Sequence, residues 1–264
     1  MQGFWPVNHH RAGSGEPLLL IHGIGSRWQV WQPVLYCLEA QRMVIAIDLP
    51  GFGASPMPPP GTPAGVHSLT RLVCDFLDGL GLETVHAAGN SLGGWVALEL
   101  AKLGRARTVT ALSPAGFQNE REAVFQLTTM WVTVRAARAA APVASALLGG
   151  SVGRRVAFVQ LVAHPERIPP ADAVGHLRAL AGAPWFDETL PAINADRFGG
   201  GEQIEVPVTI AWGEHDHLLL PRQAPRAARA IPTARLVLLR GCGHVPTYDD
   251  PGQVASVLLE GSAG

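Results

Sequence analysis

Short apolar segments alternating with longer amphipathic ones are the feature that most constrains the fold of this 264-residue chain. Six runs have the length and residue types of buried strands: Pro17–Ile21, Met43–Ile47, Thr84–Ala88, Thr108–Leu112, Pro207–Trp212 and Arg235–Leu239. Helical spacing occupies Trp28–Leu38, Ser68–Leu80, Leu92–Leu103, Pro221–Ala230 and Pro251–Leu259, with Ser68 expected as an N-cap. Strands that are apolar throughout and separated by helices are typical of a parallel sheet covered on both faces. The pattern predicts an α/β fold with a mostly parallel, doubly wound sheet.

One stretch interrupts this alternation. Residues 115–200 contain no convincing strand, but several alanine-, leucine- and arginine-rich segments at helical spacing, separated by prolines. We expect them to form a helical cap inserted into an α/β core made of residues 1–114 and 201–264. Only sixteen residues precede Pro17, so we expect at most one short pair of strands at that edge of the sheet.

Composition narrows the classes of partner. A formal net charge of −1 gives no electrostatic reason to expect nucleic acid or an anionic membrane. The most apolar long window, residues 139–153, is broken by Pro142 and is too short to span about 30 Å of bilayer. Three widely spaced cysteines and no visible secretory signal favour a cytoplasmic protein without disulfides. We expect a monomer or a homodimer.

The segment AAGNSLGGWVALEL, residues 87–100, places Gly89 and Gly93 two positions either side of Ser91. The pentapeptide follows a predicted strand and precedes a predicted helix, which is the setting of a nucleophile elbow. There the serine hydroxyl projects from a sharp turn, and the flanking residues must lack side chains. A glycine-rich turn without chemistry is the alternative, because the pentapeptide alone also occurs by chance.

A serine hydroxyl reacts only when a base takes its proton and donors stabilise the oxyanion. His244 follows the last predicted strand, and Asp216 follows the strand before it, so both should reach the same sheet edge as Ser91. Asp216 is the expected partner of the imidazole, and Glu214, earlier in the same turn, is a weaker rival. No metal motif accompanies the histidines that flank Asp216, so no metal site is predicted.

The order Ser91, Asp216, His244, together with HGIG at 22–25 and DLPGFG at 48–53, resembles that of capped, single-domain α/β-hydrolase-fold enzymes. The resemblance extends from Pro17 to Leu259.

In that family two backbone N–H groups bind the oxyanion, which implies Ile24 and Leu92 here, with Gly25 as the alternative to Ile24. The resemblance also makes His22 a structural residue. Asp48, at a strand end, is interpreted as ordering its loop instead of as a catalytic group.

The resulting hypothesis is a serine hydrolase, without cofactor or metal, that cleaves carboxylic esters of small, fairly apolar molecules. A carbon–carbon bond hydrolase of ring-cleavage diketones is the nearest alternative, although many such enzymes carry Trp where this chain has Val245. Halide-removing and epoxide-opening relatives use an aspartate nucleophile. Because Ser91 occupies that position here, those two reactions are disfavoured. A perhydrolase needs the same triad, and a ligand receptor with slow turnover could retain it.

Overall fold

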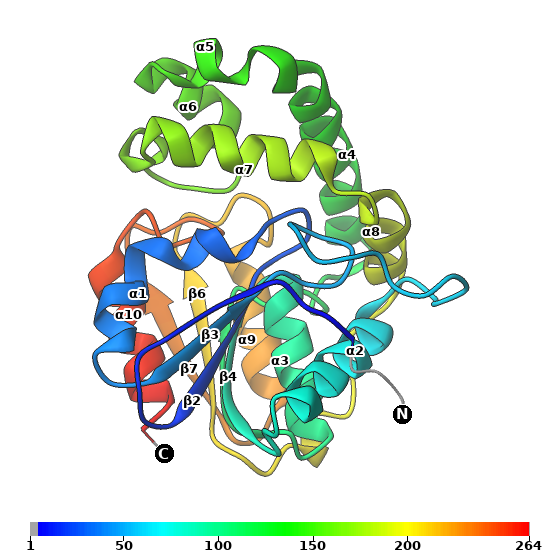
Figure 1. Ribbon diagram of the computed structural model, residues 1–264. Coiled ribbons are helices and arrows are strands. Elements are labelled where there is room, and N and C mark those ends of the chain that lie inside the picture. Colours follow the sequence, from blue (N-terminus) through cyan, green and yellow to red (C-terminus); the bar gives the residue numbers. More distant parts are fainter. Residues whose placement is uncertain (1–4, 264) are drawn as a thin grey trace.

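A seven-stranded sheet, in the order β1-β3-β2-β4-β5-β6-β7, lies at the centre of the computed structural model, which describes residues 5–263 (Figure 1). Its strands are β1 His9–Ala12, β2 Pro17–Ile21, β3 Met43–Ile47, β4 Val85–Asn90, β5 Ala106–Leu112, β6 Val208–Gly213 and β7 Ala234–Leu239. Strand β1 is antiparallel to β3, and every other neighbouring pair is parallel. The predicted α/β fold is confirmed, and β1 is the single described strand before Pro17.

Helices cover both faces of this sheet. On one face are α1 Gln32–Glu39 and α10 Pro251–Gly261, and on the other are α2 Val66–Gly79, α3 Leu92–Lys102 and α9 Ala224–Ala230. Successive strand side chains point to opposite faces. Leu18 and Leu20 therefore pack on the face covered by α1 and α10, whereas Leu19 and Ile21 pack on the face covered by α2, α3 and α9. Burial on both faces explains why the strands are apolar throughout.

Helix α2 begins earlier than expected. Its first residue is Val66 and its N-cap position is Gly65, so the prediction of Ser68 as N-cap is wrong. Val66 is 2% exposed and continues the apolar stripe of Leu69 and Val73 by one more turn. Packing of that extra turn against the core decides where the helix starts, and Ser68 is buried inside it.

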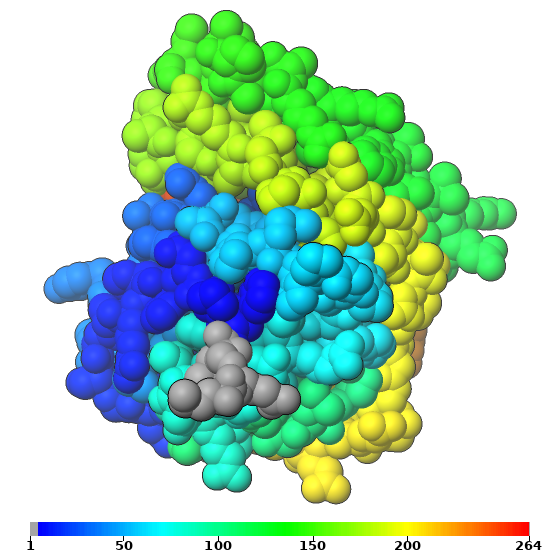
Figure 2. All heavy atoms as spheres, turned by 45° about the vertical axis from the view of Figure 1, so that its right-hand side comes forward, coloured from blue at the N-terminus to red at the C-terminus, as the bar shows by residue number. Residues whose placement is uncertain are grey.

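The segment between β5 and β6 is helical and lies over the carboxyl ends of the parallel strands (Figure 1). We call it the helical layer; it contains α4 Glu120–Ala140, α5 Ala144–Leu148, α6 Ser151–Phe158, α7 Pro170–Gly182 and α8 Phe186–Ala195. Figure 2 shows its green and yellow-green spheres as a lobe on top of the molecule. Leu148, Phe158 and Leu177 belong to an apolar cluster made mainly of layer residues, which Tyr248 of the core also joins. Within residues 5–263 no helix combines the length and hydropathy needed to cross a membrane.

Glu122, in the first turn of α4, fastens the helical layer to the core. Its buried carboxylate accepts a hydrogen bond from Arg222 Nε at 2.6 Å, another from Arg226, and a third from the Asn119 N–H at 2.9 Å. Burial by itself would raise the pKa of Glu122, but the Asn119 N–H and the two arginines together hold it below the ordinary value of 4.5.

Removing this charge should destabilise the protein in a pH-dependent way. A carboxyl whose pKa is lowered by folding stabilises the native state above its unfolded pKa, and the effect is lost as the pH falls through the folded value. We expect Glu122→Gln to lower the free energy of unfolding by about 1–3 kcal/mol at neutral pH. The difference from wild type should shrink below pH 4.5. Urea unfolding at both pH values measures it, with the exposed Glu120→Gln as control. A difference independent of pH would contradict this account.

Candidate active site

Ser91 occupies the sharp turn between β4 and α3, with φ of 57°. A non-glycine residue in this region costs about 1–3 kcal/mol unless its surroundings hold it there. The surroundings do so: the Ser91 N–H donates to Leu112 O at 2.9 Å, and Ser91 O accepts from the N–H groups of Trp95 and Ala115. The main chain on both sides therefore fixes the strained conformation that the sequence pattern predicts.

The glycines on either side of Ser91 allow helix α3 to pack against the sheet at backbone contact. A Cβ on Gly89 would lie 2.1 Å from Gly93 O, and a Cβ on Gly93 would lie 2.1 Å from Ile21 O. Real Cβ atoms do not approach backbone oxygens so closely, and the backbone cannot move aside as a side chain could. The glycines are thus required by a close approach of α3 to β2 and β4.

Asp216 and His244 meet at the same edge of the sheet. His244 Nδ1 donates to Asp216 Oδ2 at 2.8 Å, and both side chains are buried. The other carboxylate oxygen of Asp216 accepts from the N–H groups of Leu218 and Leu219 at 2.9 and 2.8 Å. Because Nδ1 is the donor, Nε2 of His244 carries the lone pair. The rival carboxylate, Glu214, is exposed and accepts instead from the Gly241 N–H at 2.9 Å.

The two expected oxyanion donors come from the first residue of α3 and from the loop after β2. Leu92 is the first residue of α3, where an N–H has no intrahelical acceptor and the helix dipole favours negative charge. Ile24 lies in the loop after β2 and lines the same cavity as Ser91. In the part of the chain that the structure describes, neither N–H donates a backbone hydrogen bond.

His22 and Asp48 hold the loops that surround the site. The Leu49 N–H donates to His22 Nε2 at 2.9 Å, so the His22 proton is on Nδ1, which donates to Gly23 O at 2.7 Å. Burial lowers the pKa of His22 and keeps it neutral. The Asp48 carboxylate accepts from the N–H groups of Trp28 and Ala54 at 2.6 and 2.8 Å. Neither residue lines the cavity, and both make the loop contacts expected of them.

Asn90 is a residue whose contribution the sequence analysis missed. Its buried Nδ2 donates to His244 O at 2.8 Å and to Leu112 O at 3.1 Å, which ties the serine turn to the histidine loop. The position next to Ser91 was the only sequence signal for it.

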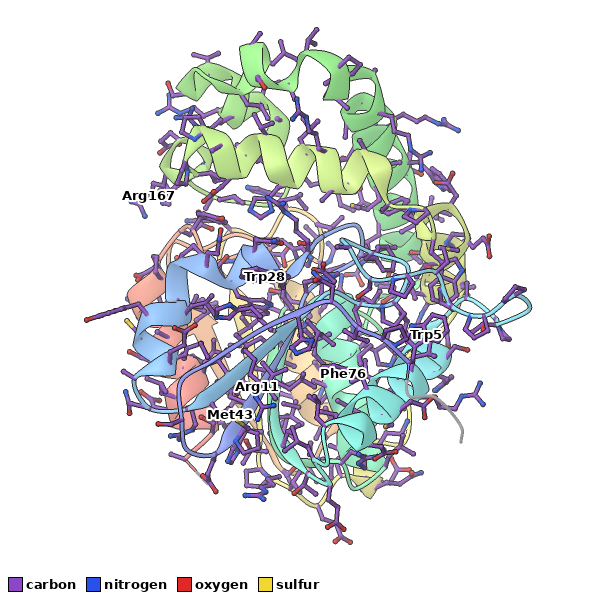
Figure 3. The ribbon with its side chains drawn as sticks, viewed as in Figure 1. Trp5, Arg11, Trp28, Met43, Phe76 and Arg167 are labelled. Carbon is purple, nitrogen blue, oxygen red and sulfur yellow. The ribbon has the colours of Figure 1, made fainter. Side chains whose placement is uncertain are left out.

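Asp249 was also missed, and it joins the histidine loop to the helical layer. Its buried carboxylate accepts from the N–H groups of Gly243 at 2.8 Å, Ala163 at 3.1 Å and His164 at 2.7 Å. Arg167, which Figure 3 shows between the layer and the core, donates to Asp249 O. No sequence motif marks Asp249, because its partners are backbone groups from two distant segments.

Ser91 and His244 face a cavity of about 80 Å³ between the core and the helical layer. The rest of its wall is mainly apolar and comes from both parts: Gly23, Ile24, Gly25, Ser26, Val30, Asn90, Met130, Phe158, Leu161, Val162, Ile168, His176, Leu180, Leu218, Val245 and Tyr248. No Asp, Glu, Lys or Arg is among these described residues.

Two polar side chains of this wall, His176 and Tyr248, are hydrogen-bonded to each other. Tyr248 OH donates to Asp172 Oδ2 at 3.2 Å and accepts from His176 Nε2 at 2.9 Å. Burial, with a smaller effect of Arg27, lowers the pKa of His176 to about 3, so its ring is neutral at physiological pH. Sequence reasoning could not place His176 in the site, because a helical pattern does not reveal which face meets the core.

Comparison with known proteins establishes the family. The Alpha/beta hydrolase family model matches residues 18–257, and the chain belongs to that family. It is 33% identical to Epoxide hydrolase EphH of Mycobacterium tuberculosis over 195 residues, which are 69% of this chain and 87% of the relative. It is also 39% identical to the 2-hydroxy-6-oxo-2,4-heptadienoate hydrolase of Pseudomonas putida, over 98 residues covering 36% and 35% of the two chains.

Solved structures show the same fold. The enol-lactonase from Burkholderia xenovorans LB400 superimposes with a TM-score of 0.78 at 20% identity, covering 96% of this chain and 95% of that one. A thermophilic esterase from Thermogutta terrifontis gives 0.74 at 22%, covering 96% and 92%. The family assignment makes hydrolysis the class of reaction. Among residues 5–263, no group of three or more His, Cys, Asp or Glu side chains could hold a metal ion.

The close packing of the serine turn can be tested by adding one methyl group. We expect Gly93→Ala to destabilise the protein by about 3 kcal/mol or more, because its Cβ would meet the backbone oxygens of Ile21 and His22. A matched control is Gly182→Ala at the end of α7, where a Cβ meets nothing within 4 Å. Thermal unfolding of both variants measures the effect, and equal midpoints would refute the packing argument.

Proposed function

We propose that this protein is a serine hydrolase that cleaves carboxylic esters of small, apolar, uncharged molecules through an acyl-enzyme. The observation that carries the proposal is the 2.8 Å hydrogen bond from His244 Nδ1 to the buried carboxylate of Asp216, with His244 and the strained Ser91 facing one cavity. An imidazole held in this tautomer is a general base for a serine hydroxyl.

In the proposed mechanism, Ser91 Oγ attacks the ester carbonyl carbon while its proton passes to His244 Nε2. The carbonyl oxygen becomes an oxyanion and accepts hydrogen bonds from the N–H groups of Ile24 and Leu92. When the carbonyl re-forms, the bond to the alcohol oxygen breaks, and His244 gives that oxygen the proton. Water then attacks the acyl-enzyme, again losing its proton to His244. When the bond to Ser91 Oγ breaks, His244 gives that oxygen the proton, and the carboxylic acid is released.

The cavity supports an apolar and uncharged substrate. Its described wall has no Asp, Glu, Lys or Arg side chain, and the buried His176 is neutral. Two charged side chains near this wall, Arg27 by His176 and Asp172 on Tyr248 OH, are opposite in sign and do not line the cavity. An anionic group there would therefore lose its hydration without gaining a direct counter-ion. We propose that the helical layer acts as the cap of the site, since Met130, Phe158 and Leu180 close the cavity from above. Excluding water in this way strengthens the electrostatic stabilisation of the oxyanion.

Carbon–carbon hydrolysis is the second candidate, supported by the partial match to the heptadienoate hydrolase. A dienoate carries a carboxylate, and the cavity wall supplies no Lys or Arg side chain from the described residues to meet it. We therefore rank the ester reaction first. A screen of aryl and alkyl diketone acids beside uncharged esters separates the two, and faster turnover of the diketones would reverse this order.

Epoxide opening, which the name of one relative indicates for that protein, fits this site poorly. Attack of Ser91 Oγ on an epoxide carbon would form an alkyl ether. Such an ether has no carbonyl carbon for water to attack and no oxyanion for Ile24 and Leu92 to stabilise. A serine nucleophile thus favours substrates that contain a carbonyl group.

Substitution of the triad gives a graded test. We expect Ser91→Ala to abolish hydrolysis of p-nitrophenyl butyrate. Asp216→Asn should lower kcat by about 10⁴-fold, because the amide favours the wrong imidazole tautomer. Glu214→Gln, a change of the neighbouring exposed carboxylate, should leave kcat within about twofold of wild type. Loss of activity in Glu214→Gln but not in Asp216→Asn would show that Asp216 is not the carboxylate of the triad.

Labelling separates an enzyme from a triad-retaining receptor. A fluorophosphonate probe should label wild type at Ser91 and leave Ser91→Ala unlabelled. A labelled protein with kcat far below about 1 s⁻¹ on every ester class would favour the receptor.

A further inference from the structure

A second and larger cavity, of about 530 Å³, lies inside the helical layer. We call it the layer chamber. Its wall is made by α4, α5, α6, α7 and one residue of the loop after α6: Val132, Thr133, Ala136, Ala137, Ala140, Leu147, Leu148, Gly153, Val156, Ala157, Phe158, Leu161, Leu177 and Leu180. Thr133 is the single polar side chain among them, and its hydroxyl already donates to Gln160 Oε1 at 2.9 Å.

Small side chains create this space. Ala136, Ala137 and Ala140 come from the alanine-rich end of α4, and Ala157 comes from α6. Leucine or phenylalanine at these alanine positions would fill the volume between the helices. The alanine-rich end of α4 therefore leaves a cavity open between the helices, which its composition alone does not indicate. Gly153 of α6 serves close packing instead, since a Cβ there would meet the Leu147 carbonyl oxygen.

The layer chamber adjoins the cavity that contains Ser91. Phe158, Leu161 and Leu180 line both cavities, so these three side chains form the boundary between them, and a chain that reaches from Ser91 into the layer must displace them. The boundary is entirely apolar. On the far side, Val132, Leu147 and Val156 line the chamber and are 63%, 49% and 75% exposed, so the chamber also reaches the outer surface.

We propose that the layer chamber binds a long, unbranched aliphatic chain of the substrate, so that this hydrolase prefers long-chain esters. The inference rests on the proposed function and names its substrate class. A chamber without an unsatisfied polar side chain can stabilise only an apolar ligand. A water molecule occupies about 30 Å³ of liquid, and a methylene group is of similar size, so a chain of about ten or more carbons fits.

Chain length should therefore increase turnover well beyond butyrate. Burial of each methylene group is worth up to about fourfold in kcat/KM. We expect a total rise of about a hundredfold or more between p-nitrophenyl butyrate and decanoate, measured below their aggregation concentrations. A parallel series of alkyl butyrates shows whether the chain belongs to the acid or to the alcohol. A flat or falling profile in both series would overturn the proposal while leaving the ester hydrolase intact.

Filling the chamber provides a matched pair of variants. Ala140→Phe and Ala157→Phe should lower kcat/KM for decanoate by about thirtyfold or more and change that for acetate by less than about twofold. Ala139→Phe is the control, since Ala139 is the exposed neighbour of Ala140 on α4 and does not line the chamber. Equal effects on acetate and decanoate would indicate damage to the fold and contradict a chain-binding chamber.

A binding measurement keeps the inference independent of turnover. By calorimetry, Ser91→Ala protein should bind 1-decanol at least about thirtyfold more tightly than 1-butanol, and adding Ala157→Phe should abolish the difference. If no ester is hydrolysed but this preference is found, the chamber is supported and the proposed reaction is wrong. If esters are hydrolysed and the two alcohols bind alike, the chamber proposal fails alone.

Discussion

Parallel pairing of β2, β4, β5, β6 and β7 is the constraint on which the rest of this structure depends. Parallel neighbours cannot be joined by a tight turn, so each connection crosses a face of the sheet, usually as a helix. Their carboxyl ends all lie at one edge, and the loops that leave them must meet there. For this reason Ser91 and His244, far apart in the chain, line one cavity, and Asp216 is bonded to His244.

Much of this arrangement is predictable, because the information is local. A strand buried on both faces must be apolar at every residue, so β2 and β3 were located to the residue. Once the strands are known, the turn that follows each strand has a known position, and Asp216 is favoured over Glu214 because Glu214 comes earlier in that turn. The start of α2 was not predictable in the same way, since the burial of Val66 depends on what packs against it.

The rest depends on which helix faces meet, and the sequence does not encode that locally. His176 and Tyr248 form one hydrogen-bonded pair from α7 and the loop before α10. Each position alone is compatible with an ordinary surface or core residue. Asn90 and Asp249 bind backbone groups, which every residue possesses, so no partner residue type could have signalled them. Cavities are harder still to predict from the sequence, because they lie where side chains are too small to fill the space between helices.

Asp249 gives the helical layer an influence on the imidazole without touching it. One carboxylate holds the Gly243 N–H beside His244 and two N–H groups of the layer, and the Val245 N–H donates to Leu161 O at 2.7 Å. Residues 161–164 cannot leave the core without breaking charge-assisted hydrogen bonds to the histidine loop. A displacement of residues 161–164 would therefore also release the backbone N–H groups of Gly243 and Val245, on both sides of His244.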